Sequence, residues 1–228
     1  MLEHNPYSAI STNIFGTLNL VNAAQTSGTS QFILISSDKA VYPTSIMGAT
    51  KRFAEELCRT INREKTMNLM AVRFGNVLGS RGSVVPIFQK QIAEGGPVTV
   101  RGANVRRYFM SISEATLLVL QASSMGKGGE IFILDMGQPI RILDLARDLI
   151  RLSGMEPDHD IPIIFTDLRP GEKESEELFT SEEGTKSTSH QQIHVADQKT
   201  TIPYTKILEI LSLLEDSVYK LDLERCLD

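Results

Sequence analysis

The chain has 228 residues, of which 41% are hydrophobic and 22% are charged, and this composition is typical of a globular protein with one large domain or one and a half. The net charge of −5 argues against a nucleic-acid-binding surface, where a basic stripe is expected. Cys58 and Cys226 lie far apart and the histidines show no ligand spacing, so we expect no metal site, no disulfide framework and a reducing cytoplasm.

The first third of the sequence alternates predicted helices and strands. Asn5 and Pro6 suit the N-cap and the first turn of a helix, and apolar residues then recur at helical spacing until Gly28. Two short apolar runs further on predict fully buried strands of a parallel sheet. In chain order, the expected elements are a helix over 5–28, a strand over 32–35, a helix over about 47–63 and a strand over 69–74. This alternation indicates α/β architecture with crossover connections.

The pattern becomes looser after residue 74. A glycine-containing loop is expected first, and Ser111 to Glu114 fits a capping box at the start of an apolar helix. The segment 180–199 is polar and is expected to be a mobile linker before a terminal amphipathic helix. The predicted elements are a loop over 75–83, helices over 84–93, 115–122, 142–152 and 202–223, and strands over 98–100, 130–134 and 161–165.

The beginning of the chain lacks two features. A doubly wound nucleotide-binding domain starts with a strand, a glycine-rich turn and a helix, and no such motif occurs near this N-terminus. The segment also lacks the charged and apolar regions of a signal peptide, and no apolar run approaches the roughly 20 residues that span a bilayer. We therefore expect an N-terminally truncated sheet, whose exposed apolar faces favour association.

A polar segment follows the first predicted strand. Ser36, Ser37, Asp38 and Lys39 come directly after the buried run, at the carboxyl end of the sheet, where open α/β sheets bind ligands. In the next helix, Met47 and Lys51 are four residues apart and share a face. The alternative is a surface loop followed by a helix with solvated lysines.

Five strings carry a resemblance to a known family. In order, they are SSDKAVYPTSIMGATKR, RFGNVLGSRGSVVPIF, RRYFMSISEA, GGEIFILDMGQPIRILDLARDLI and LRPGEK. Together they resemble the CapD-like polysaccharide-biosynthesis branch of the extended short-chain dehydrogenase/reductases, which includes UDP-N-acetylglucosamine 4,6-dehydratases. The resemblance covers about residues 1 to 180.

The resemblance implies a fold and an activity. The fold would be a partial Rossmann-type parallel sheet, without its first strands, joined to a small α/β substrate-binding lobe. The activity would be NAD- or NADP-dependent dehydration of a UDP-N-acetylhexosamine to a 4-keto-6-deoxy sugar by a cytoplasmic enzyme, whose full-length relatives can be membrane-anchored. The chain would form a homo-oligomer or associate with the missing N-terminal segment. The expected domains are 1–83 with 111–135 for the cofactor, 84–110 with 136–180 for the substrate, and 181–228 as linker and helix.

Catalytic roles follow from the same resemblance. The superfamily uses Tyr-x-x-x-Lys, but Met47 stands at the tyrosine position, and a thioether cannot act as acid or base. The long, membrane-anchored members also carry Met there. We therefore expect Asp38 to protonate the departing C6 hydroxyl and Lys39 to remove the C5 proton. Ser37 would hydrogen-bond the C4 oxygen, and Lys51 would orient the cofactor ribose.

The resemblance also implies residues that bind the cofactor. Asn13 matches a family position that supports the active site and cofactor; the alternative is a structural hydrogen bond from a mid-helix asparagine. The expected cofactor-binding residues are Asn13, Ser36, Lys51, Phe74 and Gly75.

Two arginines are the best candidates for holding a diphosphate. Arg107 and Arg169 lie in matching strings, and a guanidinium offers a planar fork of donors; the alternative for each is a surface ion pair. Arg81 and Arg106 are weaker candidates, and one of them is expected to be merely solvated. Glu172 would fix a sugar or ribose hydroxyl, or the arginine itself. The expected substrate-binding residues are Lys39, Asn76, Ser83, Val84, Pro86, Arg107, Arg169 and Glu172.

Two positions depart from the family pattern, and three functions stay open. Tyr42 stands where Asn is usual, and Ser175 where an aromatic is usual.

The chain is expected to be part of a dehydratase, a non-catalytic nucleotide-sugar-binding module, or a UDP-sugar epimerase. The adjacent Asp38 and Lys39 favour the dehydratase, because elimination requires a dedicated acid and base.

Overall fold

The computed structural model describes residues 2–62, 67–80, 82–197 and 202–220, with side chains through Val218. The chain divides into two compact units. Unit 1 comprises Met1–Phe74, Leu118–Asp135 and Glu177–Asp228, and unit 2 comprises Gly75–Leu117 and Met136–Glu176. The chain passes from unit 1 to unit 2 at the end of the strand that begins with Asn68, and each unit has its own strands and core.

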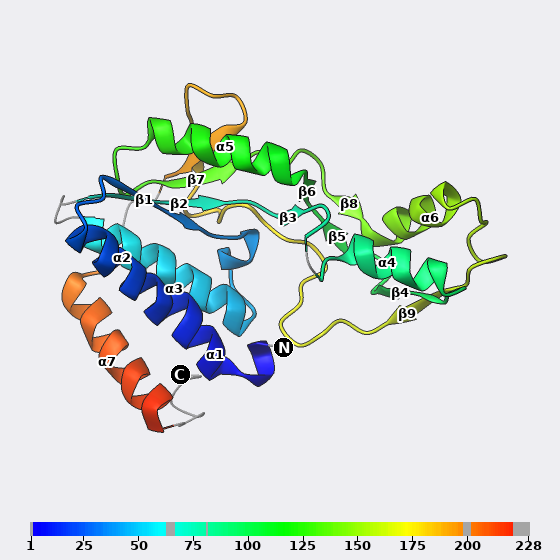
Figure 1. Cartoon of the computed structure of the whole chain (residues 1–228), viewed down its shortest axis with the longest axis horizontal. Helices are drawn as coiled ribbons and strands as arrows, with labels where there is room; N and C mark the ends of the chain where they lie inside the picture. Colours follow the sequence, from blue (N-terminus) through cyan, green and yellow to red (C-terminus); the bar gives the residue numbers. More distant parts are fainter. Residues whose placement is uncertain (1, 63–66, 81, 198–201, 221–228) are drawn as a thin grey trace. The chain divides into compact units, whose positions relative to one another are not determined.

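A five-stranded sheet forms the centre of unit 1 (Figure 1). Its order is β1-β2-β7-β11-β10. Strands β1 and β2 are parallel, as the two buried apolar runs predicted, and β7 pairs parallel with β2. In β2, five consecutive residues are buried, which agrees with a strand covered on both faces. The strands are β1 (Gln31–Ile35), β2 (Asn68–Arg73), β7 (Ile131–Leu134), β10 (Thr185–Ser187) and β11 (Ile193–Ala196).

The expected polar linker contains strands instead. Strand β11 pairs antiparallel with β7, and β10 pairs antiparallel with β11, so this segment extends the sheet. The expectation for 180–199 was therefore wrong over its described part, through Asp197. The local sequence shows few apolar residues because β10 is exposed at every position and lies at the edge of the sheet. Ile193 and Ala196 supply the buried positions of β11.

Helices lie on both faces of this sheet (Figure 1). Asn5 caps the first helix by accepting a hydrogen bond from the Ser8 N–H at 3.2 Å. The single predicted helix over 5–28 is interrupted by a π-helical turn at Ser11–Phe15, which the apolar spacing did not indicate. The helices of unit 1 are α1 (Pro6–Ile10), α2 (Gly16–Thr26), α3 (Ile46–Ile61), α5 (Ile112–Met125, from Leu118 on) and α7 (Tyr204–Lys220).

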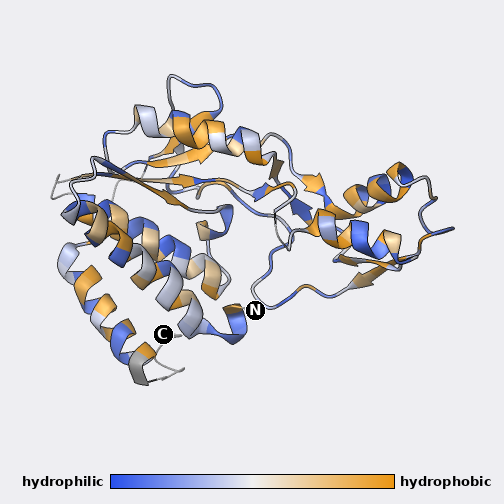
Figure 2. Ribbon diagram, viewed as in Figure 1, coloured by the Kyte–Doolittle hydropathy of each residue, from blue (hydrophilic) through white to orange (hydrophobic). Residues whose placement is uncertain are grey.

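One hydrophobic cluster of unit 1 includes residues of the sheet and of α1, α3 and α7. Leu57 and Cys58 of α3, Ile207 of α7 and Leu69 of β2 belong to one buried cluster. Figure 2 shows the corresponding apolar colouring on the strands and on the inner sides of the helices. Because this cluster combines the beginning and the end of the chain, α7 is an integral part of unit 1.

The described residues of unit 2 form helices α4 (Val84–Ala93) and α6 (Ile142–Leu152), the first turns of α5 and three small two-stranded sheets. Helices α4 and α6 have the predicted bounds. Their buried residues, including Phe88, Ala146 and Ile150, pack with Val98 and Val100. The strand pairs are β3 (Asn76–Val77) with β6 (Phe109–Met110), β4 (Val98–Arg101) with β9 (Ile163–Thr166), and β5 (Arg106–Arg107) with β8 (Ile140–Arg141). The two-residue strands were not predicted, since β3 lies in an expected loop.

None of the helices in the described ranges has the length and apolarity needed to cross a membrane.

Candidate functional site

The loop after β1 is fixed to the end of β2 by backbone hydrogen bonds. The Ser36 N–H donates to the Val72 carbonyl at 2.8 Å, and the Asp38 N–H donates to the Phe74 carbonyl at 3.1 Å. Residues Asp38–Ala40 then form a 3-10 turn. The parallel strands β1 and β2 therefore present this loop at their carboxyl edge, as the sequence predicted.

Asp38 and Lys39 form an ion pair in this turn. The Lys39 Nζ donates to Asp38 Oδ1 at 2.9 Å, and the Ser37 Oγ donates to the same oxygen at 2.8 Å. The Asp38 side chain is fully buried, whereas the Lys39 side chain is 27% exposed. The turn brings together two side chains that an extended loop would point apart.

The second carboxylate oxygen of Asp38 differs from the first in its hydrogen bonding. Oδ2 is buried and has no hydrogen-bond partner among the described residues. An unpaired buried acceptor costs about 1–3 kcal/mol, so such atoms are rare in native structures. One carboxylate oxygen of Asp38 therefore accepts hydrogen bonds from Ser37 and Lys39, whereas the other accepts none from the described residues.

Lys51 lies on α3, and its amine faces the end of β1. Its Nζ donates to the Ile35 carbonyl at 3.1 Å. Burial lowers the pKa of Lys51, and the charge of Glu55 one turn further along the helix partly opposes this effect. Met47, four residues before Lys51, is half-buried and accepts a hydrogen bond from Thr50 at its carbonyl. Gly48 allows close packing, because a Cβ there would collide with the Lys39 carbonyl oxygen.

Two expected cofactor residues have partners within unit 1. The Asn13 Nδ2 donates to Thr50 Oγ1 at 3.0 Å, so Asn13 connects the π-helical turn to α3. The Ser36 hydroxyl is buried and donates to Glu55 Oε1 at 2.6 Å. Both side chains therefore make structural hydrogen bonds next to the loop, which for Asn13 is the alternative that the sequence left open.

A buried charge network lies beside this loop. Arg73 at the end of β2 is fully buried and donates to Glu55 through Nε and Nη2, each at 2.7 Å. It also donates to Glu183 at 2.9 and 3.1 Å. Burial lowers the pKa of Arg73, but the hydrogen bonds and charges of Glu55 and Glu183 outweigh it, so the net pKa is raised. Sequence reasoning missed this network; the only local signal was a charged residue ending a buried strand.

In unit 2, the two arginines of β5 have different roles. Arg107 is 7% exposed, and its guanidinium donates to the carbonyls of Arg106, Lys173 and Glu174 and to Glu172. Arg106 is exposed. Neighbouring residues of a strand point to opposite faces, so only one of the two arginines can face a ligand on a given side. The structure therefore gives Arg107 a role in fixing the 172–176 segment and leaves the Arg106 guanidinium accessible.

The other predicted phosphate residue, Arg169, is exposed. Its N–H donates to Glu172 Oε2 at 3.2 Å, and Glu172 Oε1 accepts from Arg107 at 3.4 Å. Glu172 therefore contacts the backbone of Arg169 and the guanidinium of Arg107. Arg81 lies outside the described residues.

The start of α4 contains the remaining predicted substrate residues. Ser83 is the N-cap, and its Oγ is buried without a partner among the described residues. Pro86 is exposed in the first helical turn, where a missing N–H is tolerated. Asn76 is part of β3, and its N–H donates to the Tyr108 carbonyl at 3.1 Å. Gly75 and Val84 also belong to unit 2, whereas Phe74 ends the first segment of unit 1.

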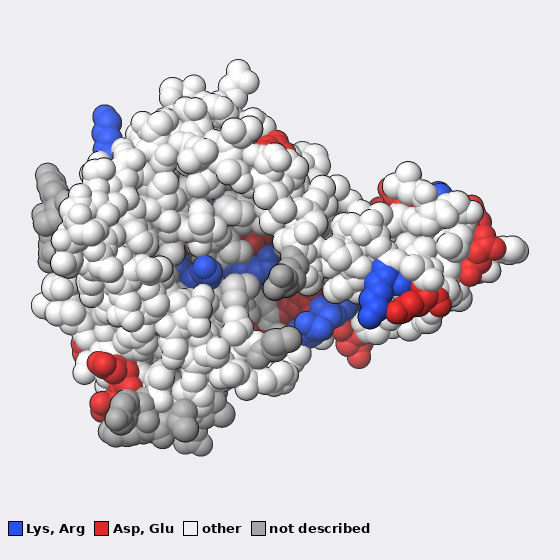
Figure 3. Space-filling view, in the orientation of Figure 1, with Lys and Arg blue, Asp and Glu red and all other residues white. Residues whose placement is uncertain are grey.

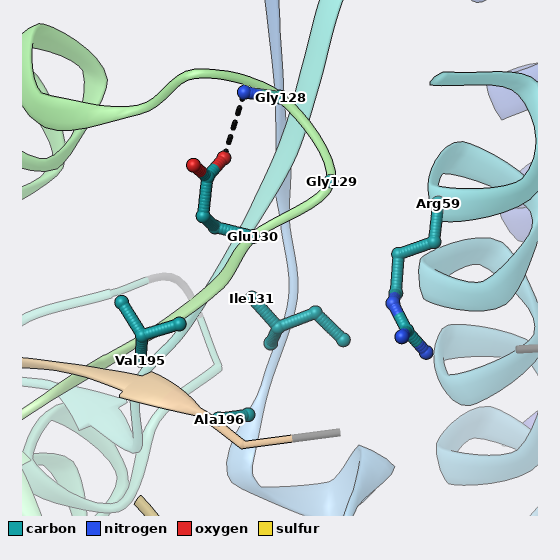
Figure 4. Close-up of a pocket in the computed structure, with 7 residues that line it drawn as sticks. All are labelled: Arg59, Gly128, Gly129, Glu130, Ile131, Val195 and Ala196. Atoms are coloured by element: carbon teal, nitrogen blue, oxygen red, sulfur yellow. Dashed lines mark hydrogen bonds between the residues drawn. The ribbon is translucent and has the colours of Figure 1, made fainter. Parts of the chain in front are cut away.

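A pocket of about 240 Å³ lies at the other edge of the unit 1 sheet (Figure 4). It is lined by the start of β7 and the end of β11, whereas the 36–39 loop follows the carboxyl end of β1. Its polar groups already have partners: Gly128 N–H donates to Glu130, and Arg59 donates to Glu56. We therefore assign it no ligand.

Charges of both signs lie side by side on the surface of unit 2 that Figure 3 shows. Exposed ion pairs of unit 2 include Lys90 with Glu94 and Arg151 with Asp148. Across the described ranges, no group of three or more His, Cys, Asp or Glu residues could hold a metal ion.

The fold defines a class of protein. Pen from Bacillus thuringiensis, a solved structure, has a TM-score of 0.80 and 36% identity to this chain, covering 88% of this chain and 63% of that one. A UDP-glucose 4-epimerase from Thermus thermophilus in complex with NAD has a TM-score of 0.69 at 19% identity, covering 78% of this chain and 64% of that one, and here the likeness shows the fold alone. The chain has the Rossmann-type fold of extended short-chain dehydrogenase/reductases.

The sequence comparisons define the family. Residues 1–198 match the polysaccharide biosynthesis protein family, and the chain belongs to it. The probable polysaccharide biosynthesis protein EpsC of Bacillus subtilis is 53% identical over 195 residues, which are 86% of this chain and 32% of EpsC. A UDP-glucose 4-epimerase of Rickettsia canadensis is 36% identical over 188 residues, which are 81% of this chain and 54% of that protein. The chain therefore spans between a third and about half of these relatives.

Proposed function

We propose that this chain forms the proton-transferring and substrate-binding part of an NAD(P)-dependent UDP-N-acetylhexosamine 4,6-dehydratase, acting on UDP-N-acetylglucosamine for polysaccharide synthesis. The family match supports the polysaccharide role, and solved relatives bind UDP-sugars. The observation that carries the proposal is the Asp38–Lys39 pair at the carboxyl edge of the sheet, with Asp38 Oδ2 left unsatisfied. The two separated cysteines support a cytoplasmic location.

The reaction requires proton transfers that this pair can make. The substrate loses one water in three events. The C4 hydroxyl gives up a hydride and a proton, the C5 proton and the C6 hydroxyl then leave, and finally a hydride returns to C6 and a proton to C5. Lys39 as a free amine would take the C5 proton, and Asp38 as a carboxylic acid would protonate the departing hydroxyl. In the structure, Lys39 donates the hydrogen bond and Asp38 accepts it. Transfer of one proton along this 2.9 Å hydrogen bond gives both working forms.

The residues of unit 1 fit one end of a dinucleotide cofactor. NAD(P), when bound, supplies the hydride acceptor and donor. The Lys51 amine is fixed at the end of β1, beside a loop with an unsatisfied carboxylate oxygen, and it would bind ribose hydroxyls. Asn13 and Ser36 would support this region through their hydrogen bonds to Thr50 and Glu55.

In unit 2 we assign the phosphate contact of β5 to Arg106 in place of Arg107, together with Arg169. Arg106 and Arg169 are exposed, whereas the Arg107 guanidinium is buried against carbonyl oxygens. Ser83, Val84, Pro86 and Asn76 would line the nucleotide-sugar site as the family resemblance implies.

The test combines binding and turnover. UDP-N-acetylglucosamine and NAD⁺ are titrated into the full chain by calorimetry, and conversion is followed as loss of one water from the substrate by mass spectrometry. Asp38→Asn and Lys39→Met should each lower kcat by about 10²- to 10⁴-fold, the usual range for a general acid or base. Lys186→Met is the control, because Lys186 forms an exposed ion pair with Asp197.

Each other outcome identifies a different function. Full turnover in both the Asp38→Asn and Lys39→Met variants would exclude the pair from the mechanism. A product of unchanged mass and altered stereochemistry would establish an epimerase, the second candidate, which the 36% identity to the Rickettsia canadensis protein favours. Binding without conversion would establish a binding module.

A further inference from the structure

A short turn from the third segment of unit 1 lies against the 36–42 loop. In residues 180–183, the Thr180 N–H donates to Glu183 Oε2 at 3.2 Å, and the Glu183 N–H donates to Thr180 Oγ1 at 3.0 Å. These reciprocal hydrogen bonds give the turn a fixed form. We call residues 180–183 the acidic turn.

The first connection from the acidic turn runs through buried charges. The Glu183 side chain is 2% exposed and accepts two hydrogen bonds from Arg73. Arg73 in turn binds both oxygens of Glu55, and Glu55 Oε1 accepts the Ser36 hydroxyl at 2.6 Å. The path therefore reaches the residue at which the 36–42 loop begins.

The second connection reaches the other end of the loop. The Tyr42 hydroxyl lies 2.9 Å from Ser181 Oγ and accepts a hydrogen bond from the Ser181 N–H at 3.0 Å. Tyr42 has a φ of +42°, which is unfavourable for a bulky side chain and persists only where the surroundings support it. The hydroxyl contact with the acidic turn provides such support.

We propose that Glu183 and Tyr42 are positioning residues, through which the acidic turn holds both ends of the 36–42 loop and so fixes the Asp38–Lys39 pair. Asp38 and Lys39 lie between the two attachment points. Glu183 reaches the start of the loop through Arg73 and Glu55, and Tyr42 connects its end to Ser181, so each acts on the pair through other groups. The catalytic meaning of the pair rests on the proposed function, whereas the attachment of the loop does not.

The test separates loop position from overall stability and from activity. Hydrogen–deuterium exchange is measured on the full chain for Glu183→Gln and Tyr42→Phe, with Glu182→Gln as the matched control, because Glu182 is the exposed neighbour. Tyr42→Phe removes one hydroxyl from a residue that is 42% exposed, so it should fold even if Glu183→Gln does not. Loss of one such hydrogen bond corresponds to about a fivefold to tenfold loss of protection.

We expect that loss at the Asp38, Ala40 and Val41 amides, which donate within the loop or to Phe74, and no change in β2 or β7. With UDP-N-acetylglucosamine and NAD⁺, kcat should fall about tenfold with KM within about twofold, as expected for a group that affects only the transition state. A uniform change across unit 1, or an unchanged loop in folded variants, would overturn the proposal. A chain that shows the loop effect but no turnover in any form would overturn the proposed function instead.

Discussion

Two adjacent arginines of β5 show how strongly the surroundings of a residue decide its role. Arg107 donates to three carbonyl oxygens and Glu172, whereas Arg106 is exposed on the opposite face of the same short strand. A guanidinium that already holds carbonyl oxygens has few donors left for a diphosphate. The two residues should therefore respond differently to truncation.

We expect Arg106→Ala to weaken UDP binding by about 10- to 100-fold, the loss of one charge-assisted contact, with stability changed by less than about 0.5 kcal/mol. Arg107→Ala should lower the free energy of unfolding by about 3 kcal/mol, because it leaves buried acceptors unpaired. Calorimetric titration with UDP and urea unfolding measure the two effects. Equal loss of affinity without loss of stability in Arg107→Ala would return the phosphate role to that residue.

The lowered pKa of Lys51 predicts the direction in which stability changes with pH. Because burial lowers its pKa, the unfolded chain binds this proton more tightly than the folded chain. Between the lowered value and 10.5, stability therefore rises with pH as the folded amine loses its proton first. Lys51→Met should be at least as stable as the parent at neutral pH. As the pH rises toward 10.5, the free energy of unfolding of the parent should increase relative to that of the variant.

Urea unfolding over this pH range checks the prediction, with the exposed Lys90→Met as the control. A Lys51→Met variant that is less stable at neutral pH than at alkaline pH, relative to the parent, would contradict it. The same variant should lose turnover, since the amine is assigned to the cofactor ribose.

At the scale of elements, β2, α3 and the acidic turn are joined by one buried charge network. Arg73 ends β2, Glu55 belongs to α3, and Glu183 belongs to the turn before β10. The same helix carries Cys58, whose burial raises the pKa of its thiol to about 12 and makes it unreactive in the folded chain. The buried face of α3 is thus partly apolar and partly ionic.

We expect Arg73→Met to lower the free energy of unfolding by about 3–5 kcal/mol, because two buried carboxylates lose Arg73 and keep only the partly exposed Arg52 as a cationic partner. Adding Glu55→Gln and Glu183→Gln should restore part of this loss, since no unpaired charge remains. Arg151→Met is the control, because its exposed ion pair with Asp148 contributes at most about 1 kcal/mol. Urea unfolding of the four proteins checks the prediction, which fails if the triple variant is the least stable.

At the scale of the whole molecule, each unit has a hydrophobic cluster of its own among the described residues. One lies in unit 1 around Leu57 and Leu69, and the other lies in unit 2 around Phe88 and Ile150. Because each core is formed within its own unit, a cavity in one should leave the other intact.

Ile150→Ala should destabilise unit 2 by about 2–5 kcal/mol, since Ile150 is fully buried. Hydrogen exchange should increase in Gly75–Leu117 and Met136–Glu176 and stay unchanged in β1 and β2. Leu152→Ala on the same helix is the control, because Leu152 is 83% exposed. Equal acceleration in both units would show that they unfold as one.

The sequence by itself determined the α/β class, the parallel strands β1 and β2, most of the helices with the bounds of α4 and α6, the family, and the loop that carries Asp38 and Lys39. These features follow from local periodicity, capping residues and strings of residues, all of which are written along the chain. The tertiary structure alone decided the pairing of β10 and β11, the π-helical turn, the opposite roles of Arg106 and Arg107, and the Glu55–Arg73–Glu183 network. Their partners are distant in sequence, so strand register and burial, which no local pattern records, select them.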